Sequence, residues 1–325
     1  MEWEHSHDRR EDLAYGHQPV LLEECLKGLD IQPDGIYIDG TLGRAGHSLE
    51  IVRRLTTGRL IGIDRDASAI EAAERRLADY QDRVTLVRGN FSDLDAILRQ
   101  LEVPLVQGML FDLGVSSPQL DEAQRGFSYR LDAPLDMRMD VTAPLDAYQV
   151  VNTYGEGELK RILYEYGEER YAPAIAREIV RQRQGAPIET TLQLVEVIKR
   201  AMPAAALREK QHPAKRSFQA IRMEVNGELE ALPPMLHAAA DHLAPGGRLA
   251  VITFHSLEDR IVKKTLQELA TGCTCPPEFP VCVCGKKPKL QLINRKPIVA
   301  GETELSENPR ARSAKLRIAK RCGEE

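Results

Sequence analysis

The chain has 325 residues, of which 42% are hydrophobic and 29% are charged, an ordinary composition for a globular protein. No apolar run approaches the roughly 18 residues that a membrane-spanning helix needs, and we expect no membrane partner. The formal net charge of −5 argues mildly against a nucleic-acid partner unless basic residues gather locally. Residues 1–16 are polar and charged, and we interpret them as a disordered leader and not as a secretory signal.

Apolar runs of strand length recur along the chain and predict five β-strands, over residues 36–38, 60–63, 84–87, 109–111 and 248–254. Helices are expected over residues 19–29, 66–80 and 257–269. Strands that alternate with helices in this way form a parallel sheet with helices on both faces. The strand-like runs at residues 290–293 and 315–319 are expected to pair as an antiparallel hairpin at the edge of that sheet.

The pattern changes between the fourth and fifth strands, where helices are expected over residues 154–167, 173–184 and 191–202. We therefore expect a doubly wound α/β domain made of residues 17–115 and 214–325, with a helical substrate-recognition subdomain of residues 116–213 inserted into it. Insertions on the carboxyl side of a parallel sheet commonly cover the ligand crevice.

A glycine-rich turn follows the first strand, where residues 39–48 read DGTLGRAGHS. Its spacing of Gly40, Gly43 and Gly46 is not the Gly-x-Gly-x-x-Gly of dinucleotide sites, which argues against a pyrophosphate ligand. A nucleoside that carries methionine has no phosphate and needs close backbone approach more than an anion cradle. The turn therefore favours S-adenosylmethionine, although a purely structural turn gives the same pattern.

Two further residues follow strand ends and fit the same ligand. Asp64 ends the second strand, about 20 residues after the turn, where a carboxylate can accept both ribose hydroxyls; Asp66 close by suits a helix N-cap equally well. Phe91 follows the third strand and is either a cover for an adenine ring or a core phenylalanine.

Asp112 ends the fourth strand and is the candidate catalytic residue. A cytosine amino group is a poor nucleophile because its lone pair is delocalised into the ring, and an oxygen that accepts its N–H increases the electron density on nitrogen. Asp112 either has this role or orients the methionine amino group of the cofactor. His255 and Ser256 follow the fifth strand as further substrate-side candidates, and Ser256 is alternatively a helix cap. No metal is required for this chemistry.

Long strings of the chain resemble the bacterial 16S rRNA cytosine-N4 methyltransferase family of the MraW or RsmH type. The similarity extends from residue 17 to residue 313 and includes the strings at residues 39–41, 112–119, 125–128, 134–139, 166–170, 218–222 and 254–260. It implies a Rossmann-like class I methyltransferase sheet and N4-methylation of a cytidine in the decoding region of 16S rRNA, with the assembled small subunit as substrate.

The resemblance also implies a set of cofactor contacts, which with the glycine turn comprises Gly43, Ala45, Gly46, His47, Asp64, Phe91, Asp112 and Gln119. One departure is visible, because family members often have glycine at the position of Ala45. A methyl group there disfavours a positive φ, so cofactor affinity would fall if the site needs that conformation.

Basic residues are concentrated in two regions, with eleven Lys/Arg against three Asp/Glu from Lys286 to Arg321 and thirteen against nine from Gly155 to Arg222. We expect Lys215, Arg216 and Arg222, together with Lys210, to contact RNA phosphates, although such clusters are often only solvated faces. Phe218 between them suits a base-stacking role less well than a place in the core.

The six cysteines include a tight cluster, Cys273, Cys275, Cys282 and Cys284, whereas Cys25 and Cys322 stand alone. In the absence of an export signal we expect a cytoplasmic protein without a disulfide framework. The cluster is either a four-thiolate zinc site, for which the Cys-x-Cys spacing is imperfect, or a set of reduced thiols in a proline-rich loop.

Two other functions remain open from the sequence. The first is a methyltransferase that acts on a DNA amine or a small molecule, and the second is a non-catalytic RNA-binding protein of ribosome assembly. The helical insertion and the basic regions favour a large polyanion over a small molecule, and the cofactor motifs favour an enzyme over an assembly protein.

Overall fold

The computed structural model describes residues 19–275, 281 and 283–323, so the expected leader at residues 1–16 lies outside the described residues. The chain divides into a core unit, which contains the residues up to 114 and from 230 onward, and an insert unit of residues 115–229. The second boundary therefore differs from the expected one after residue 213. The reason is that α12 (Lys215–Asn226) packs on α7 (Ala147–Thr153) and α8 (Glu156–Glu165) of the insert unit.

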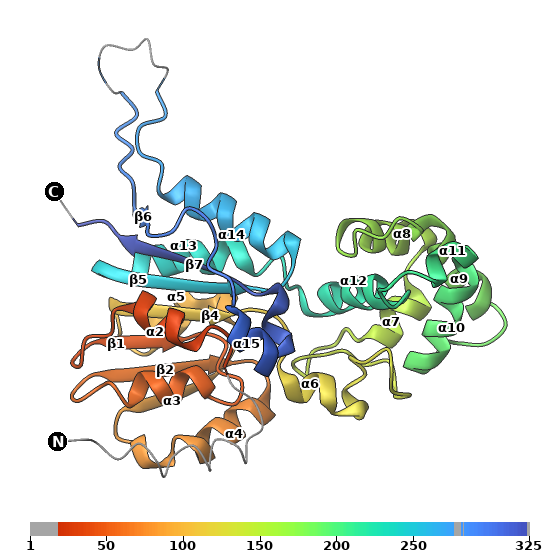
Figure 1. Ribbon diagram of the computed structural model, residues 1–325, viewed down its shortest axis with the longest axis horizontal. Coiled ribbons are helices and arrows are strands. Elements are labelled where there is room, and N and C mark those ends of the chain that lie inside the picture. The colour runs from red at the N-terminus through yellow and green to blue at the C-terminus, as the bar shows by residue number, and fades with distance from the viewer. Residues whose placement is uncertain (1–18, 276–280, 282, 324–325) are drawn as a thin grey trace. The chain divides into compact units, whose positions relative to one another are not determined.

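The core unit contains a seven-stranded sheet in the order β3-β2-β1-β4-β5-β7-β6 (Figure 1). Its strands are β1 (Ile36–Asp39), β2 (Arg59–Asp64), β3 (Val84–Arg88), β4 (Val106–Asp112), β5 (Leu243–Thr253), β6 (Leu290–Leu292) and β7 (Lys315–Arg321). The first five strands are parallel, whereas β7 runs antiparallel to both β5 and β6. The expected antiparallel pair at the sheet edge is therefore confirmed.

Helices cover both faces of this sheet. They are α2 (Leu22–Leu29), α3 (Gly46–Val52), α4 (Ala67–Arg76), α5 (Leu94–Gln100), α13 (Leu232–His242) and α14 (Ser256–Leu269), and a short α15 (Glu302–Glu307) precedes β7. Apolar residues of α2, α3 and α4 share one core cluster with strand residues such as Leu60, Leu110 and Ile252. On the other face, α13 packs against α5 and α14. The expected doubly wound sheet is thus confirmed, and the chain leaves it between β4 and β5 for the insert unit.

Because β1 to β4 are parallel, their carboxyl ends lie at one edge of the sheet. The strand register pairs Asp39 with Gly62 and Leu110, and Asp112 with Ile252. The loops that leave these strand ends therefore converge, which is where ligands bind in open α/β sheets. Among the described residues, no helix has both the length and the apolar composition that crossing a membrane requires.

The insert unit is helical and has a core of its own. Its helices are α6 (Ser117–Asp121), α7, α8, α9 (Ala172–Arg183), α10 (Thr191–Ala201), α11 (Ala204–Leu207) and α12. The three helices expected here match α8, α9 and α10, whereas no helix was expected at the positions of α6, α7 and α11. Phe218 of α12 is buried in this core, which confirms the core interpretation of that residue.

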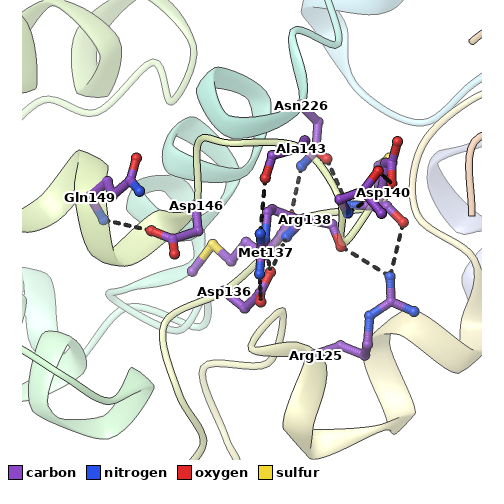
Figure 2. Close-up of polar contacts among 11 residues, drawn as sticks. Arg125, Asp136, Met137, Arg138, Asp140, Ala143, Asp146, Gln149 and Asn226 are labelled. Atoms are coloured by element: carbon purple, nitrogen blue, oxygen red, sulfur yellow. Dashed lines mark hydrogen bonds and ion pairs between the residues drawn. The ribbon is translucent and has the colours of Figure 1, made fainter.

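A polar cluster fixes the irregular segment that precedes α7 (Figure 2). Asp136 binds Arg138 through both carboxylate oxygens, and Arg125 donates to the carbonyl oxygens of Arg138 and Met139 at 3.0 and 3.1 Å. The side chain of Asn226 donates to the Met137 carbonyl at 2.7 Å and accepts the Met139 N–H at 2.8 Å. These bonds satisfy buried backbone groups, so the strings at residues 125–128 and 134–139 act as scaffold of the insert unit.

Candidate active site

The glycine turn and Asp64 are joined by hydrogen bonds. The Gly43 N–H donates to Asp64 Oδ2 at 2.9 Å, and the Asp66 N–H donates to Asp64 Oδ1 at 2.9 Å. Burial raises the pKa of the Asp64 carboxyl, against the lowering effect of these two bonds. Gly43 has a φ of +50°, a conformation that favours glycine. The turn is therefore held against the tip of β2, and each carboxylate oxygen retains a lone pair for a further donor.

Asp39 anchors the start of the same turn. Its carboxylate accepts the Ser48 hydroxyl at 2.7 Å and the Thr41 N–H at 3.2 Å, and burial raises its pKa to about 6. Thr41 in turn accepts the backbone N–H of Asp112 at 2.6 Å. The sequence showed Asp39 only as the residue that opens the turn, and its strand-end position was the one signal for this role.

Of the acids Asp39, Asp64 and Asp112 at the carboxyl edge of the sheet, Asp112 has the fewest side-chain hydrogen bonds. Burial, and then the charges of Asp39 and Glu258, raise the pKa of Asp112 to about 8. Its Oδ1 has no hydrogen-bond partner among the described residues, although the side chain remains 25% exposed. A buried acceptor in this state favours a ligand that brings a hydrogen-bond donor or a positive charge.

His47 faces this acid with its second ring nitrogen. Its Nε2 lies 3.0 Å from the Val20 carbonyl oxygen, and because a carbonyl only accepts, Nε2 carries the proton. Nδ1 lies 3.8 Å from Asp112 Oδ2. Burial lowers the pKa of His47 to about 4, so the ring is neutral at pH 7. His47 therefore fixes the turn against the start of α2 and does not carry a proton at neutral pH.

Ala45 adopts the left-handed conformation that its methyl group disfavours. Its φ is 56° and its ψ is 34°, it precedes the first residue of α3, and its methyl group is fully buried. A side chain on the next residue, Gly46, would come within 2.7 Å of Pro19 Cγ. The turn is thus closely packed, and Ala45 bears a strain of about 1–2 kcal/mol relative to an ordinary helical conformation.

Phe91 is buried and packs edge-on against Phe111, with ring centroids 6.1 Å apart. The guanidinium of Arg65 lies 6.0 Å from the Phe91 ring centroid. Asn90 accepts the Ser92 N–H and so ends β3 with a tight turn. This packing accounts for Phe91 as a core residue, and its role as an adenine cover stays a prediction.

His255 and Ser256 lie at the carboxyl end of β5, but the cap of α14 is His255 and not Ser256. His255 Nδ1 accepts the Glu258 N–H at 3.3 Å, and its Nε2 lies 3.0 Å from Glu258 Oε1. Glu258 is buried, and its carboxylate also accepts the Phe254 N–H at 2.8 Å. A glutamate three residues after a helix cap forms a capping box. That spacing was the sequence signal for Glu258, which the sequence analysis did not name as a site residue.

The remaining candidates lie on other segments. Gln119 belongs to the insert unit, where its side chain accepts the Ser116 N–H at 3.0 Å. Lys215 is exposed at the start of α12, and Arg216 donates to the Glu168 carbonyl at 3.1 Å. Arg222 instead binds the buried Glu228 through two nitrogens at 2.8 Å each.

The insert unit also has an aromatic stack that was not predicted from the sequence. Tyr129 and His212 stack with ring centroids 4.5 Å apart, and the guanidinium of Arg130 lies 5.9 Å from the Tyr129 centroid. Tyr129 and His212 are 83 positions apart in the sequence, so no local sequence pattern indicated the stack.

The doubly wound sheet with its reversed β7, together with the acidic edge, defines a class I methyltransferase. A family model described as the MraW methylase family matches residues 14–322, and the chain belongs to that family. Two similar relatives carry the name "Ribosomal RNA small subunit methyltransferase H". The Brevibacillus brevis protein is 56% identical over 95% of this chain and 99% of its own length, and the Clostridioides difficile protein is 52% identical over 95% and 100%.

The similar solved structures are more distant in sequence. An rRNA methylase from Streptococcus thermophilus is 10% identical with a TM-score of 0.42, and the alignment covers 95% of this chain and 99% of that one. A SAM-dependent O-methyltransferase from Thermotoga maritima is 11% identical with a TM-score of 0.42, and the alignment covers 97% and 71%.

The conformation of Ala45 leads to a stability prediction. Ala45→Val should lower the free energy of unfolding by about 2–4 kcal/mol, because a β-branched side chain fits neither a positive φ nor the packed site. Ala45→Gly should change it by less than about 1 kcal/mol, because relief of the left-handed strain is offset by the lost methyl burial and the freer unfolded chain. Urea unfolding measures both. Equal stability of the valine variant and the wild type would contradict the positive φ.

The raised pKa of Asp112 leads to a pH prediction. Between the unfolded value near 4 and the folded value of about 8, the folded protein binds the extra proton, so this group makes stability fall as pH rises. Asp112→Asn removes the ionisable group, so the variant lacks this fall in stability with rising pH. The Tm of the variant minus that of the wild type should be near zero at about pH 4 and should grow up to about pH 8.

The control for this experiment is Asp93→Asn, which changes an exposed carboxyl after β3. Its Tm difference from the wild type should show no comparable rise over the same pH range. Parallel profiles of wild type and Asp112→Asn would show that Asp112 ionises normally.

Proposed function

We propose that the protein transfers a methyl group from S-adenosylmethionine to the N4 amine of a cytidine in the decoding region of 16S rRNA, within the small ribosomal subunit in the cytoplasm. The observation that carries the proposal is the edge formed by the Gly43–Asp64 hydrogen bond and the unpartnered Asp112 oxygen. The names of relatives more than 50% identical over nearly the whole chain support the substrate class.

The residues at the edge fit the proposed cofactor. Asp64 offers carboxylate lone pairs for the ribose hydroxyls, and Gly43, Ala45 and Gly46 bring the backbone close to the ligand. The buried acids Asp39 and Asp112 favour a cation, and S-adenosylmethionine carries both a sulfonium and an ammonium group. When bound, the cofactor supplies an electrophilic methyl carbon; the chain supplies its position and its electrostatic surroundings.

We assign the acceptor role to Asp112. A nearby cation favours its carboxylate form and lowers its raised pKa, so that Oδ1 can accept an N–H of the exocyclic amine. This bond increases the nucleophilicity of N4, and the same oxygen takes the proton that the methylated nitrogen must lose. His47, neutral and fixed by Val20, stays on the Oδ2 side and leaves Oδ1 for the substrate.

His255 and Ser256 remain proposed substrate-side residues, and His255 also has the capping role described above. For RNA we propose phosphate contacts by Lys215 and Arg216. Among the described residues, neither side chain forms an ion pair with a carboxylate, and Arg216 donates only to a backbone carbonyl. Arg222 is better explained as a positioning residue, because its bidentate bond to Glu228 occupies the guanidinium.

The reaction is tested with small subunits that lack the modification, labelled S-adenosylmethionine and analysis of the modified nucleoside. We expect N4-methylcytidine. Asp112→Asn should lower kcat by about 10²–10⁴-fold while the Kd for the cofactor, measured by calorimetry, changes by less than about fivefold. Asp64→Asn should instead raise that Kd at least about tenfold, because it removes a charged acceptor.

Each alternative predicts a different result. Loss of cofactor binding with kcat retained would make Asp112 only a cofactor ligand. Transfer to DNA or a small molecule but not to the subunit would replace the substrate class. RNA binding without methyl transfer, and without cofactor affinity, would point to an assembly protein.

The RNA surface is tested by reversing charge on α12. The double variant Lys215→Glu, Arg216→Glu should bind small-subunit rRNA more weakly, and the slope of log K against log salt should fall by about one for each lost phosphate contact. Lys27→Glu, an exposed position on α2, is the matched control and should leave the slope unchanged. Equal salt slopes for the double variant and the wild type would remove α12 from the interface.

A further inference from the structure

The described residues between α14 and β6 form no core that could hold the shape of this segment. Within residues 270–289, no described residue is buried, and Val281 and Val283 are 70% and 73% exposed. Its described arms extend beyond the ends of both elements (Figure 1). Its base is closed by the Lys289 N–H, which donates to the Leu269 carbonyl at 2.8 Å. Beyond this base, something other than apolar packing has to join its two arms.

Three cysteine sulfurs meet at that place. Cys273 and Cys275 come from the arm that leaves α14, and Cys284 comes from the arm that returns to β6. Their Sγ atoms all lie within 4.8 Å of one another. The arms approach again at Gly272, where a Cβ atom would come within 3.2 Å of Pro288 Cδ.

The sulfur separation fits a shared metal ion and not a disulfide. Cys273 and Cys284 Sγ lie 3.7 Å apart. Two thiolates on a tetrahedral ion with Zn–S bonds of about 2.3 Å are separated by about 3.8 Å, whereas disulfide sulfurs are about 2.05 Å apart. A tetrahedral ion would therefore fit between these two sulfurs with little rearrangement.

The backbone around the sulfurs is arranged to stabilise thiolates. The Cys275 N–H points to Cys273 Sγ at 3.4 Å, and the Val283 N–H points to Cys275 Sγ at 3.4 Å. Donors aimed at sulfur favour the ionised form, which is the form that binds metals. Gly285 follows Cys284 with a φ of +61°, so the chain turns away directly after the last sulfur.

We propose that Cys273, Cys275 and Cys284 bind a structural Zn²⁺ ion that joins the two arms of this segment. Binding releases the thiol protons to solvent and forms Zn–S bonds, with no change in oxidation state. Zinc takes four ligands, of which the described residues supply these three; Cys282 lies outside the described residues and is not assigned to the site. The proposal is independent of the methyl-transfer chemistry, because no residue of the acidic edge takes part.

The test measures zinc in the full-length protein, purified under reducing conditions without chelator and supplied with Zn²⁺ before gel filtration. We expect about one zinc per chain for the wild type and a loss of at least about fivefold for Cys273→Ser and for Cys284→Ser. Cys322→Ser is the matched control, since Cys322 lies outside the cluster, and should retain the metal. Replacement by Co²⁺ should give thiolate charge-transfer bands and the strong visible absorption of a tetrahedral site.

A readout on the wild type avoids dependence on variants that fail to fold. Removal of zinc by a chelator should speed amide hydrogen exchange in residues 270–289 at least about tenfold and leave the exchange of β1 to β5 unchanged. Less than about 0.1 zinc per chain after loading, an intact mass two hydrogens lower than that of the reduced chain, or equal zinc in Cys273→Ser would each overturn the proposal.

Discussion

The hydrogen bond from the Gly43 N–H to Asp64 is the constraint on which the candidate site depends. It fastens the loop after β1 to the tip of β2 and holds Gly43 at a positive φ. The same loop contains Ala45 and His47, and His47 is fixed by its bond to Val20. Thr41 of this loop accepts the backbone N–H of Asp112 and so positions that residue. The loop is therefore preformed by the protein's own bonds, and a ligand meets an edge whose acceptors are already positioned.

The same edge of the sheet brings several carboxyl groups together where they are largely buried from water. Burial raises the pKa of Asp39, Asp64 and Asp112, because each carboxylate loses water. Nearby acids raise it further at Asp64, through Asp66, and at Asp112, through Asp39 and Glu258. Such a cluster favours a cationic ligand and disfavours phosphate. A polyanionic substrate therefore has to be attracted by other surfaces, which agrees with the positive charge on α12 and after residue 286.

The sequence predicted those parts of the protein that depend on local pattern. Strand runs that end in Asp39, Asp64 and Asp112 gave the sheet and its polar edge, because parallel strands bring such ends together. It did not predict α12 as part of the insert unit, because that helix is assigned by packing on α7 and α8. The sequence suggested Ser256 as the alternative cap of α14; the structure uses His255, since the ring reaches the Glu258 N–H. Arg222 looked available for phosphate because its partner, Glu228, was not identifiable before the turn at Gly227 was known.

The position of β7 fixes the order in which the chain can complete its fold. This strand lies between β5 and β6, and the Leu21 N–H donates to Glu304 across 283 positions. The insert unit, in contrast, is one continuous stretch with its own apolar centre. During synthesis the insert unit can therefore become compact before β7, the last of the described strands along the chain, has been made. The sheet that carries the acidic edge is therefore complete only after residues 315–321 have been synthesised.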